Sequence, residues 1–215
     1  LYKEEIKFNL VYNTPSCIEN ANTSSAGGRI QKDDTGNIFM TIGDFQPSHT
    51  EVKEGESYKY KTNHVSQNNN THFGKIITLD TDFNPTIYSK GHRNPQGLML
   101  FDNFLLETEH GPNGGDEINQ IKEGNNYGYP FASYGFPYNL DYEMEKEHNL
   151  PFVSPILYFS PSIGISEIIY YDHDEFFRWK NKLILSSLYE NSLFIIDAVL
   201  DQKVIVKNIE KIDLS

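Results

Sequence analysis

The chain has 215 residues, of which 38% are hydrophobic and 13% aromatic, and its formal net charge at pH 7 is −12. This length suits one domain with a sizeable core, which we predict over residues 1–215. The negative charge disfavours nucleic-acid phosphates as partners, and no apolar run approaches the roughly 18 residues of a membrane span.

Short strands separated by Gly, Asn and Asp turns recur along the chain. Residues 28–44 read GRIQKDDTGNIFMTIGD, where a turn at 34–37 precedes an alternating apolar strand. Residues 73–89 and 98–111 repeat this pattern of strand, turn and strand. The last third holds four short apolar segments, ISEIIYYD, NKLILSSLY, NSLFIIDAV and KVIVKNI.

Helical signals are weak. Residues 175–182 favour at most one or two helical turns, 141–150 a solvated loop, and 49–72 a long surface excursion. Many short strands at this spacing indicate an all-β sandwich, barrel or propeller. The recurrence of similar strand pairs favours the β-propeller, and at about 40–50 residues a blade the chain supplies about four blades. Since an incomplete ring exposes sheet edges, we expect missing blades or pairing with another chain.

The loop GHRNPQG at 91–97 concentrates hydrogen-bonding groups on a bent piece of chain. Asn94 precedes a proline and is restricted to extended conformations, while Arg93 offers a planar fork of donors suited to carboxylates. Two interpretations are equally open on spacing alone. Either the polar side chains satisfy their own backbone in a turn, or they bind a ligand.

The segment ETEHGPNGGDEIN at 107–119 places acids among glycines and a proline. Its titratable residues are Glu107, Glu109, His110, Asp116 and Glu117. Calcium binds six to eight oxygens from carboxylates and loop carbonyls, and this segment supplies both. A surface loop with scattered acids is the more favoured interpretation on spacing alone.

The segment KEGNNYGYPFASYG at 122–135 is rich in rings, namely Tyr127, Tyr129, Phe131 and Tyr134. These rings stack on a flat ligand or cover the sheet, and packing is the more favoured interpretation. The remaining histidines lie in polar segments and are predicted to be surface residues: His49, His64, His72, His148 and His173.

Together these segments resemble the glucose/sorbosone dehydrogenase family over about residues 27–210. The resemblance is carried by the strings GGRI, GNIFMTIGD, IYSKGHRNPQGL, EHGPNGGDEIN, GNNYGYP and SPSIG. It implies a six-bladed propeller with pyrroloquinoline quinone (PQQ) on the axis beside calcium. It also implies hydride transfer from C1 of an aldose sugar to the quinone, with a histidine as general base, and a periplasmic or extracellular location.

The resemblance assigns roles to particular residues. Arg93, Asn94 and Gln96 match the cofactor-side loop, which implies that Arg93 and Asn94 face the quinone and its carboxylates. The backbone carbonyls of Gly111 and Pro112 match ligands of the cofactor-linked calcium.

A second, structural calcium is implied by Glu117 and the carbonyl of Tyr127, while the nearby Asp116 receives no role.

One position departs from the family pattern. The family's catalytic histidine precedes a Gly-Arg-Leu-like string, and the aligned residue here is Ser25. A hydroxyl is not a base near neutral pH without an activating partner, whereas an imidazole is. We therefore expect either a sugar dehydrogenase with impaired proton abstraction, or a non-catalytic, calcium-stabilised propeller that serves as a binding or surface-assembly module.

Overall fold

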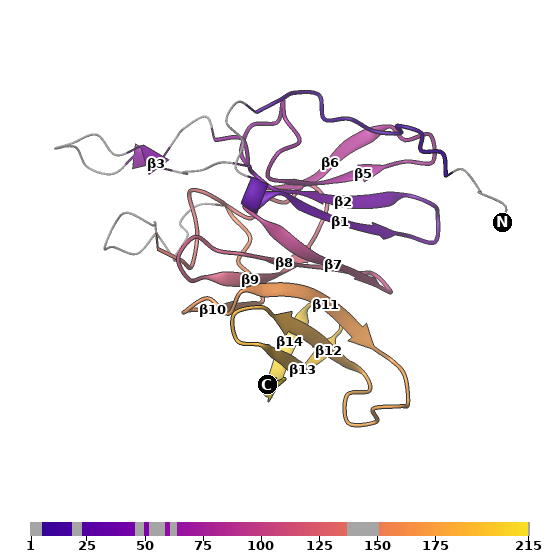
Figure 1. The fold of residues 1–215 in the computed structure, drawn as a ribbon, viewed down its shortest axis with the longest axis vertical. Coiled ribbons are helices and arrows are strands. Elements are labelled where there is room, and N and C mark those ends of the chain that lie inside the picture. Colours follow the sequence, from indigo (N-terminus) through magenta and orange to yellow (C-terminus); the bar gives the residue numbers. More distant parts are fainter. Residues whose placement is uncertain are drawn as a thin grey trace.

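The computed structural model describes residues 6–18, 23–45, 50–51, 59–60, 64–136 and 151–214. Within them the protein is built from antiparallel strands, and the one helical element is the 3-10 turn η1 (Thr23–Ser25). Twelve strands form three four-stranded sheets, which we call blades 1 to 3. The blades follow one another down the molecule from violet to yellow (Figure 1).

Each blade is an antiparallel meander whose first strand lies at one edge. Blade 1 consists of β1 (Gly27–Lys32), β2 (Ile38–Ile42), β5 (Lys75–Leu79) and β6 (Pro85–Lys90). Blade 2 consists of β7 (Pro95–Phe101), β8 (Phe104–Glu109), β9 (Asp116–Ile121) and β10 (Leu157–Phe159). Blade 3 consists of β11 (Ile165–Tyr171), β12 (Lys182–Ser187), β13 (Ser192–Leu200) and β14 (Val204–Asp213). A separate two-stranded ladder joins β3 (Thr50–Glu51) to β4 (Lys59–Tyr60).

The first strands of the blades lie side by side, because β7 packs against both β1 and β11. This is the arrangement of propeller blades around an axis, so the predicted fold class is confirmed. The described residues form three blades, whereas the length of the chain predicted about four. The difference arises because residues 43–74 and 122–156 connect strands within blades 1 and 2, and their described parts add only the short β3–β4 ladder.

The predicted turns close the hairpins through aspartates. Asp33 Oδ1 accepts hydrogen bonds from the amides of Thr35 and Asn37, both at 2.9 Å. Asp80 Oδ1 accepts equivalent bonds from the amides of Asp82 and Asn84, also at 2.9 Å. Such side-chain-to-backbone bonds are the reason that Asp favours turns.

Blade 2 is buried on both faces. Leu98 and Leu105 pack toward blade 1 with Phe39 and Ile76. Their chain neighbours Met99 and Leu106 belong instead to the cluster shared with blade 3, because successive side chains of a strand point to opposite faces. Side chains on both faces of blade 2 are therefore buried against the neighbouring blades.

Two smaller expectations concern a short segment and a histidine. Residues 175–181 form turns and no helix, with an i to i+3 bond of 2.8 Å from the Trp179 amide to the Phe176 carbonyl, and Lys182 begins β12. His64, predicted at the surface, is only 2% exposed, so that prediction was wrong.

His173 is exposed and His72 half-buried. Residues 141–150, His49 and His148 lie outside the described residues. No helix in the described part of the chain is long and apolar enough to cross a membrane.

Candidate functional site

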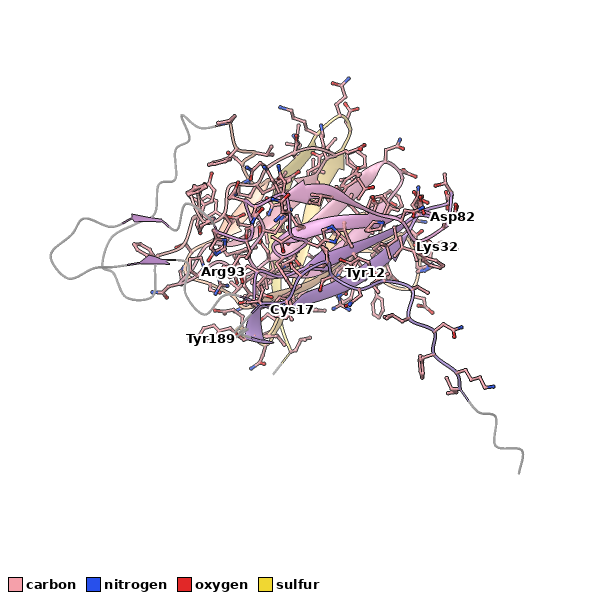
Figure 2. All side chains as sticks on the ribbon, turned by 90° about the horizontal axis from the view of Figure 1, so that it is seen from above. Tyr12, Cys17, Lys32, Asp82, Arg93 and Tyr189 are labelled. Atoms are coloured by element: carbon pink, nitrogen blue, oxygen red, sulfur yellow. The ribbon has the colours of Figure 1, made fainter. Side chains whose placement is uncertain are left out.

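The GHRNPQG loop joins blade 1 to blade 2. Backbone hydrogen bonds to neighbouring segments hold it in place. The amide of Gly91 donates to the Ser66 carbonyl at 3.0 Å, and the amide of Asp44 donates to the Arg93 carbonyl at 2.8 Å. Gly91 adopts φ +80°, a conformation that side chains disfavour. Arg93 lies at the opposite end of the strands from Lys32 and Asp82, which mark the hairpin turns of blade 1 (Figure 2).

Arg93 holds the next loop. Its Nη1 donates to the carbonyls of His110 and Gly111, at 3.0 and 2.9 Å. Its backbone amide donates to Glu109 Oε2 at 2.6 Å. The guanidinium therefore fixes the EHGP segment, whose Gly111 carbonyl is one of the atoms expected to bind calcium.

Asn94 and Gln96 hold the turn that carries Ser25. Asn94 Nδ2 donates to the Ser24 carbonyl at 3.2 Å, and Asn94 Oδ1 accepts from the Gly27 amide at 3.3 Å. Gln96 Nε2 donates to Asn94 Oδ1 at 2.8 Å. The side chains that resemblance places at a cofactor thus also bind neighbouring protein groups.

A hollow of about 260 Å³ gathers the expected site residues from three separate segments. Its lining consists of Ser24, Ser25, Arg93, Asn94, His110, Gly111, Pro112 and Ser162. Ser25, Arg93, Asn94, Gly111 and Pro112 were all singled out from the sequence. Gln96, Glu117 and Tyr127 do not line this hollow.

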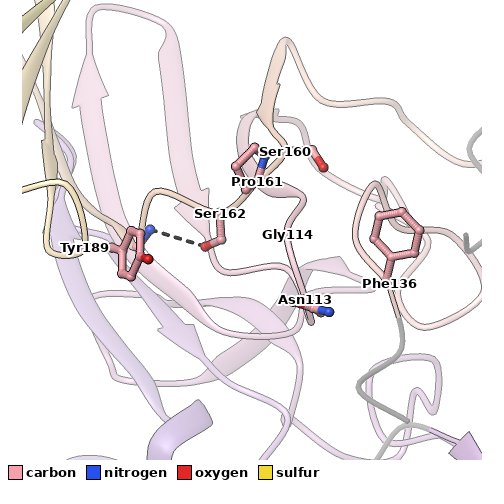
Figure 3. Close-up of a pocket in the computed structure, with 8 residues that line it drawn as sticks. Asn113, Gly114, Phe136, Ser160, Pro161, Ser162 and Tyr189 are labelled. Carbon is pink, nitrogen blue, oxygen red and sulfur yellow. Dashed lines mark hydrogen bonds between the residues drawn. The ribbon is translucent and has the colours of Figure 1, made fainter. Parts of the chain in front are cut away.

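A wider hollow of about 720 Å³ adjoins it at Ser162. Figure 3 shows this second hollow between Tyr189 on one side and Phe136 on the other, with Asn113 and Gly114 between them. The Gly164 amide donates to Ser162 Oγ at 3.2 Å. The two hollows share Ser162 as a lining residue.

Asp116, which had no assigned role, links blade 2 to blade 3. Its Oδ2 accepts from Ser162 Oγ at 2.6 Å and from the amides of Ile163 and Ile165 at 3.1 and 3.0 Å. Its Oδ1 accepts from the Gly111 amide at 3.2 Å. Asp116 is fully buried, and these four donors account for a buried carboxylate there.

The other acids of the 107–119 segment lie on strands. Glu107 and Glu109 belong to β8 and Glu117 to β9, and all three are buried. Burial, with the nearby charge of Glu109, raises the pKa of Glu107 and of Glu117 well above its usual value. The expectation of a surface loop was therefore wrong for these residues, since only the glycine-rich stretch between the two strands is a loop.

Glu117 and Tyr127 border a small cavity of about 10 Å³, beside Arg93 and Glu109, which is the size of about one water or ion. The Tyr127 hydroxyl donates to the Gln120 carbonyl at 2.6 Å and accepts from the Lys122 amide at 3.0 Å. The tyrosine is 5% exposed. The packing interpretation of this ring is confirmed, and the cavity brings together the two residues expected at the structural calcium.

His110 is a further titratable group at the hollow of about 260 Å³. Its Nδ1 lies 3.8 Å from Asp116 Oδ1, and burial lowers its pKa from the usual value. Burial therefore disfavours the charged imidazolium at this position. It lines the same hollow as Ser25 but comes from the β8–β9 loop and not from the turn before β1.

Sequence reasoning assigned no role to His92, Asn119 and Ser162. His92 was read only as part of its loop, although it is fully buried. Asn119 lies at alternate spacing from Glu117 on β9, and this strand periodicity is the signal that would have grouped it with the acids.

Comparison with known proteins identifies the family and the architecture. The family model described as glucose/sorbosone dehydrogenase matches residues 6–213. The chain is 29% identical over 173 residues to aldose sugar dehydrogenase YliI of Escherichia coli, covering 79% of this chain and 46% of that protein.

Two solved structures share the fold. The apo form of the soluble E. coli aldose sugar dehydrogenase superposes with a TM-score of 0.69 and 27% identity, covering 85% of this chain and 53% of that one. The PQQ-bound aldose sugar dehydrogenase of Streptomyces coelicolor superposes with a TM-score of 0.62 and 24% identity, covering 87% and 48%. The chain thus spans about half the length of these relatives. Because the family model covers nearly the whole sequence, the chain belongs to the glucose/sorbosone dehydrogenase family.

Proposed function

We propose that this protein is a PQQ-dependent aldose sugar dehydrogenase with a weakened proton-abstraction step. The observation that carries the proposal is the hollow of about 260 Å³ in which Arg93, Asn94, Gly111 and Pro112 meet around Ser25. The PQQ-bound form of the S. coelicolor relative supports the identity of the cofactor.

The residues around the hollow fit an anionic planar cofactor beside a hard cation. Arg93 is a fixed positive charge, because its guanidinium is braced by two carbonyls and its planar donors match carboxylates. The Gly111 carbonyl accepts one bond from Arg93 and retains a second lone pair, as a calcium ligand requires. When bound, PQQ would supply the quinone that accepts a hydride from the sugar.

The proton step is where this chain departs from its family. Sugar oxidation at C1 requires a group that accepts the hydroxyl proton as hydride leaves. Ser25 is 2% exposed and borders the hollow, but its hydroxyl is not a base near neutral pH. We therefore infer that the chain orients the cofactor and sugar but abstracts the proton slowly.

A second candidate follows from the same serine. A chain that keeps the hollow and lacks the base is also suited to a non-catalytic role, as a calcium-stabilised propeller used for binding or surface assembly. Family membership supports a periplasmic or extracellular location in both cases.

Two separate measurements test the proposal. PQQ is titrated into the purified protein with and without calcium and followed by absorbance, and aldose oxidation is then measured with an electron-accepting dye. We expect calcium-dependent binding with slow turnover. Binding without any turnover favours the non-catalytic candidate, and absence of binding contradicts the proposal.

Arg93→Lys and the exposed Arg178→Lys form a matched pair for the binding measurement. Lysine keeps the charge but not the planar fork. We expect the first substitution to weaken PQQ binding and the second to leave it unchanged. Equal affinities would show that the guanidinium does not contact the cofactor.

A further inference from the structure

Four polar residues occupy one face of blade 2, on the side of blade 1. Glu107 and Glu109 are two residues apart on β8, as are Glu117 and Asn119 on β9. The pairing register sets Glu107 opposite Asn119 and Glu109 opposite Glu117, so all four side chains point the same way. This face continues the row of Leu105 and Ile121, which pack toward blade 1.

His92 approaches this face from the blade 1 side. Its Nδ1 lies 3.5 Å from Glu109 Oε1 and 4.0 Å from Glu107 Oε2. The other ring nitrogen, Nε2, is 2.8 Å from Ser89 Oγ. The Tyr127 ring stacks on the imidazole with centroids 4.9 Å apart and an interplanar angle of 26°. These contacts fix the ring so that Nδ1 faces the carboxylates.

Three polar atoms of this cluster lack a hydrogen-bond partner among the described residues: His92 Nδ1, Glu107 Oε1 and Asn119 Oδ1. All three residues are 0% exposed. An unsatisfied buried polar atom costs about 1–3 kcal/mol, and more if it is charged. Three such atoms in one buried cluster indicate a missing partner shared between them.

The Asn119 amide does not fulfil that role. Its Nδ2 faces Glu107 Oε2 at 3.1 Å and Glu109 Oε1 and Glu117 Oε2 at 3.3 Å each. An amide nitrogen has two hydrogens, so it cannot satisfy three carboxylates at once. A cation at this position would satisfy the carboxylate oxygens and the imidazole together.

We propose that His92 Nδ1, Glu107 and Glu109 bind a divalent metal ion of the manganese and zinc class. Their ligand atoms lie within 4.8 Å of one another, a span that bonds of about 2.0–2.2 Å to a central ion bridge after small side-chain shifts. Rotation of the Asn119 amide by 180° would turn Oδ1 in place of Nδ2 toward the carboxylates, where it would serve as a fourth ligand. The Ser89 hydroxyl orients the histidine through its distal nitrogen, as is usual for metal-bound imidazoles.

The imidazole sets the class of ion. Calcium takes oxygen ligands, whereas one imidazole with carboxylates suits manganese or zinc. The ligand set differs from those of the two calcium positions expected in the family, since it uses neither the Gly111 and Pro112 carbonyls nor the pairing of Glu117 with Tyr127. The site adjoins the second of these positions, because Glu109 also borders the small cavity of Glu117 and Tyr127. It lies inside the blade interface, so its role is to join blades 1 and 2.

Metal stoichiometry tests the proposal directly. The full-length protein is stripped with a chelator and offered MnCl2, ZnCl2 or CaCl2, and bound metal is counted by elemental analysis after gel filtration. We expect about one equivalent of manganese or zinc in the wild type. We expect at least a tenfold loss of affinity in Glu107→Gln, and no loss in the exposed Glu175→Gln control.

Unchanged affinity in Glu107→Gln overturns the proposal, as does a wild-type protein that takes up calcium alone. Because the variant has a buried substitution, a second readout uses only wild-type protein. Electron paramagnetic resonance of bound Mn²⁺ is expected to show coupling to one imidazole nitrogen. Bound manganese without that coupling contradicts His92 as a ligand, whether or not the variant folds.

Discussion

At the scale of single residues, the site combines two side chains that hydrogen-bond to neighbouring loops, Arg93 and Asn94, with Ser25, which stands where the family has a histidine. Arg93 and Asn94 bind the backbone of the neighbouring loops, so each has a structural function besides any contact with a ligand. The Arg93 and Asn94 side chains satisfy the backbone of neighbouring segments instead of their own turn, and because both also border the hollow, ligand binding by GHRNPQG stays a prediction. Ser25 also borders the hollow, but its hydroxyl is not a base near neutral pH.

Restoring a base at this position should raise turnover. In Ser25→His the imidazole would stand where the family has its catalytic histidine, and a positioned general base contributes about 10²- to 10⁴-fold. We expect dye-linked aldose oxidation to rise about 100-fold or more in kcat, with PQQ affinity unchanged. Ser25→Asn is a polar control without basicity, and an equal gain in that variant would contradict the assigned role.

Lys75 is a buried cation with an unusual environment. Its Nζ donates to the carbonyls of Val65 and Phe73, at 2.7 and 2.8 Å. Burial, assisted by the charge of Lys90, lowers its pKa from 10.5 to about 7. Between these two values the unfolded chain holds a proton that the folded chain has released, so stability should increase with pH in this window.

We expect the wild type to gain about 1–2 kcal/mol of unfolding free energy between pH 7 and pH 9, as measured by urea unfolding. In Lys75→Met this gain should shrink, because the titrating group is gone. Lys207→Met, at an exposed position, should retain it. Parallel pH profiles in all three proteins would rule out the lowered pKa.

At the scale of elements, the strand pattern predicted much of the fold but concealed the buried acids. Turn residues and the alternation of Ile38, Met40 and Ile42 located the first hairpin correctly. On β8 and β9, however, Glu and Asn occupy buried positions, so the apolar alternation that marks a buried strand is absent. Distances between chemically similar residues on neighbouring strands depend on register, which the sequence does not specify.

Asp116 is the clearest example of a side chain that joins two blades. Its carboxylate collects four donors, three of them from the segment that leads into blade 3. In Asp116→Asn one oxygen becomes an amide that repels those donors and weakens charge-assisted bonds. We expect a loss of about 2–4 kcal/mol in unfolding free energy, measured by urea denaturation.

The exposed Asp201→Asn is the matched control, and we expect its unfolding free energy to stay within about 0.5 kcal/mol of the wild type. A similarly small change in Asp116→Asn would mean that the carboxylate is not needed to join blades 2 and 3.

At the scale of the whole molecule, three blades surround part of an axis, and their first strands are joined by side-chain contacts. Arg29 on β1 pairs with Glu167 on β11, with Nε and Oε2 at 2.9 Å, and also donates to the Gln96 carbonyl of β7 at 3.0 Å. The blade meander was predictable from composition and turns. The number of blades was not, because long connections use residues without adding blade strands.

The net charge of −12 gives the whole molecule a general preference for cations, which must be separated from specific calcium binding. Any salt stabilises an acidic protein by screening the repulsion between its charges. A ligand that binds only the folded state adds RT ln(1 + [L]/Kd) to the unfolding free energy.

After chelation, we expect CaCl2 to raise the unfolding temperature more than NaCl of equal ionic strength does. The extra increment should be lost in Glu117→Gln, since that carboxylate borders the small cavity shared with Tyr127, and kept in the exposed Glu210→Gln. Equal increments from the two salts would reduce the role of calcium to screening.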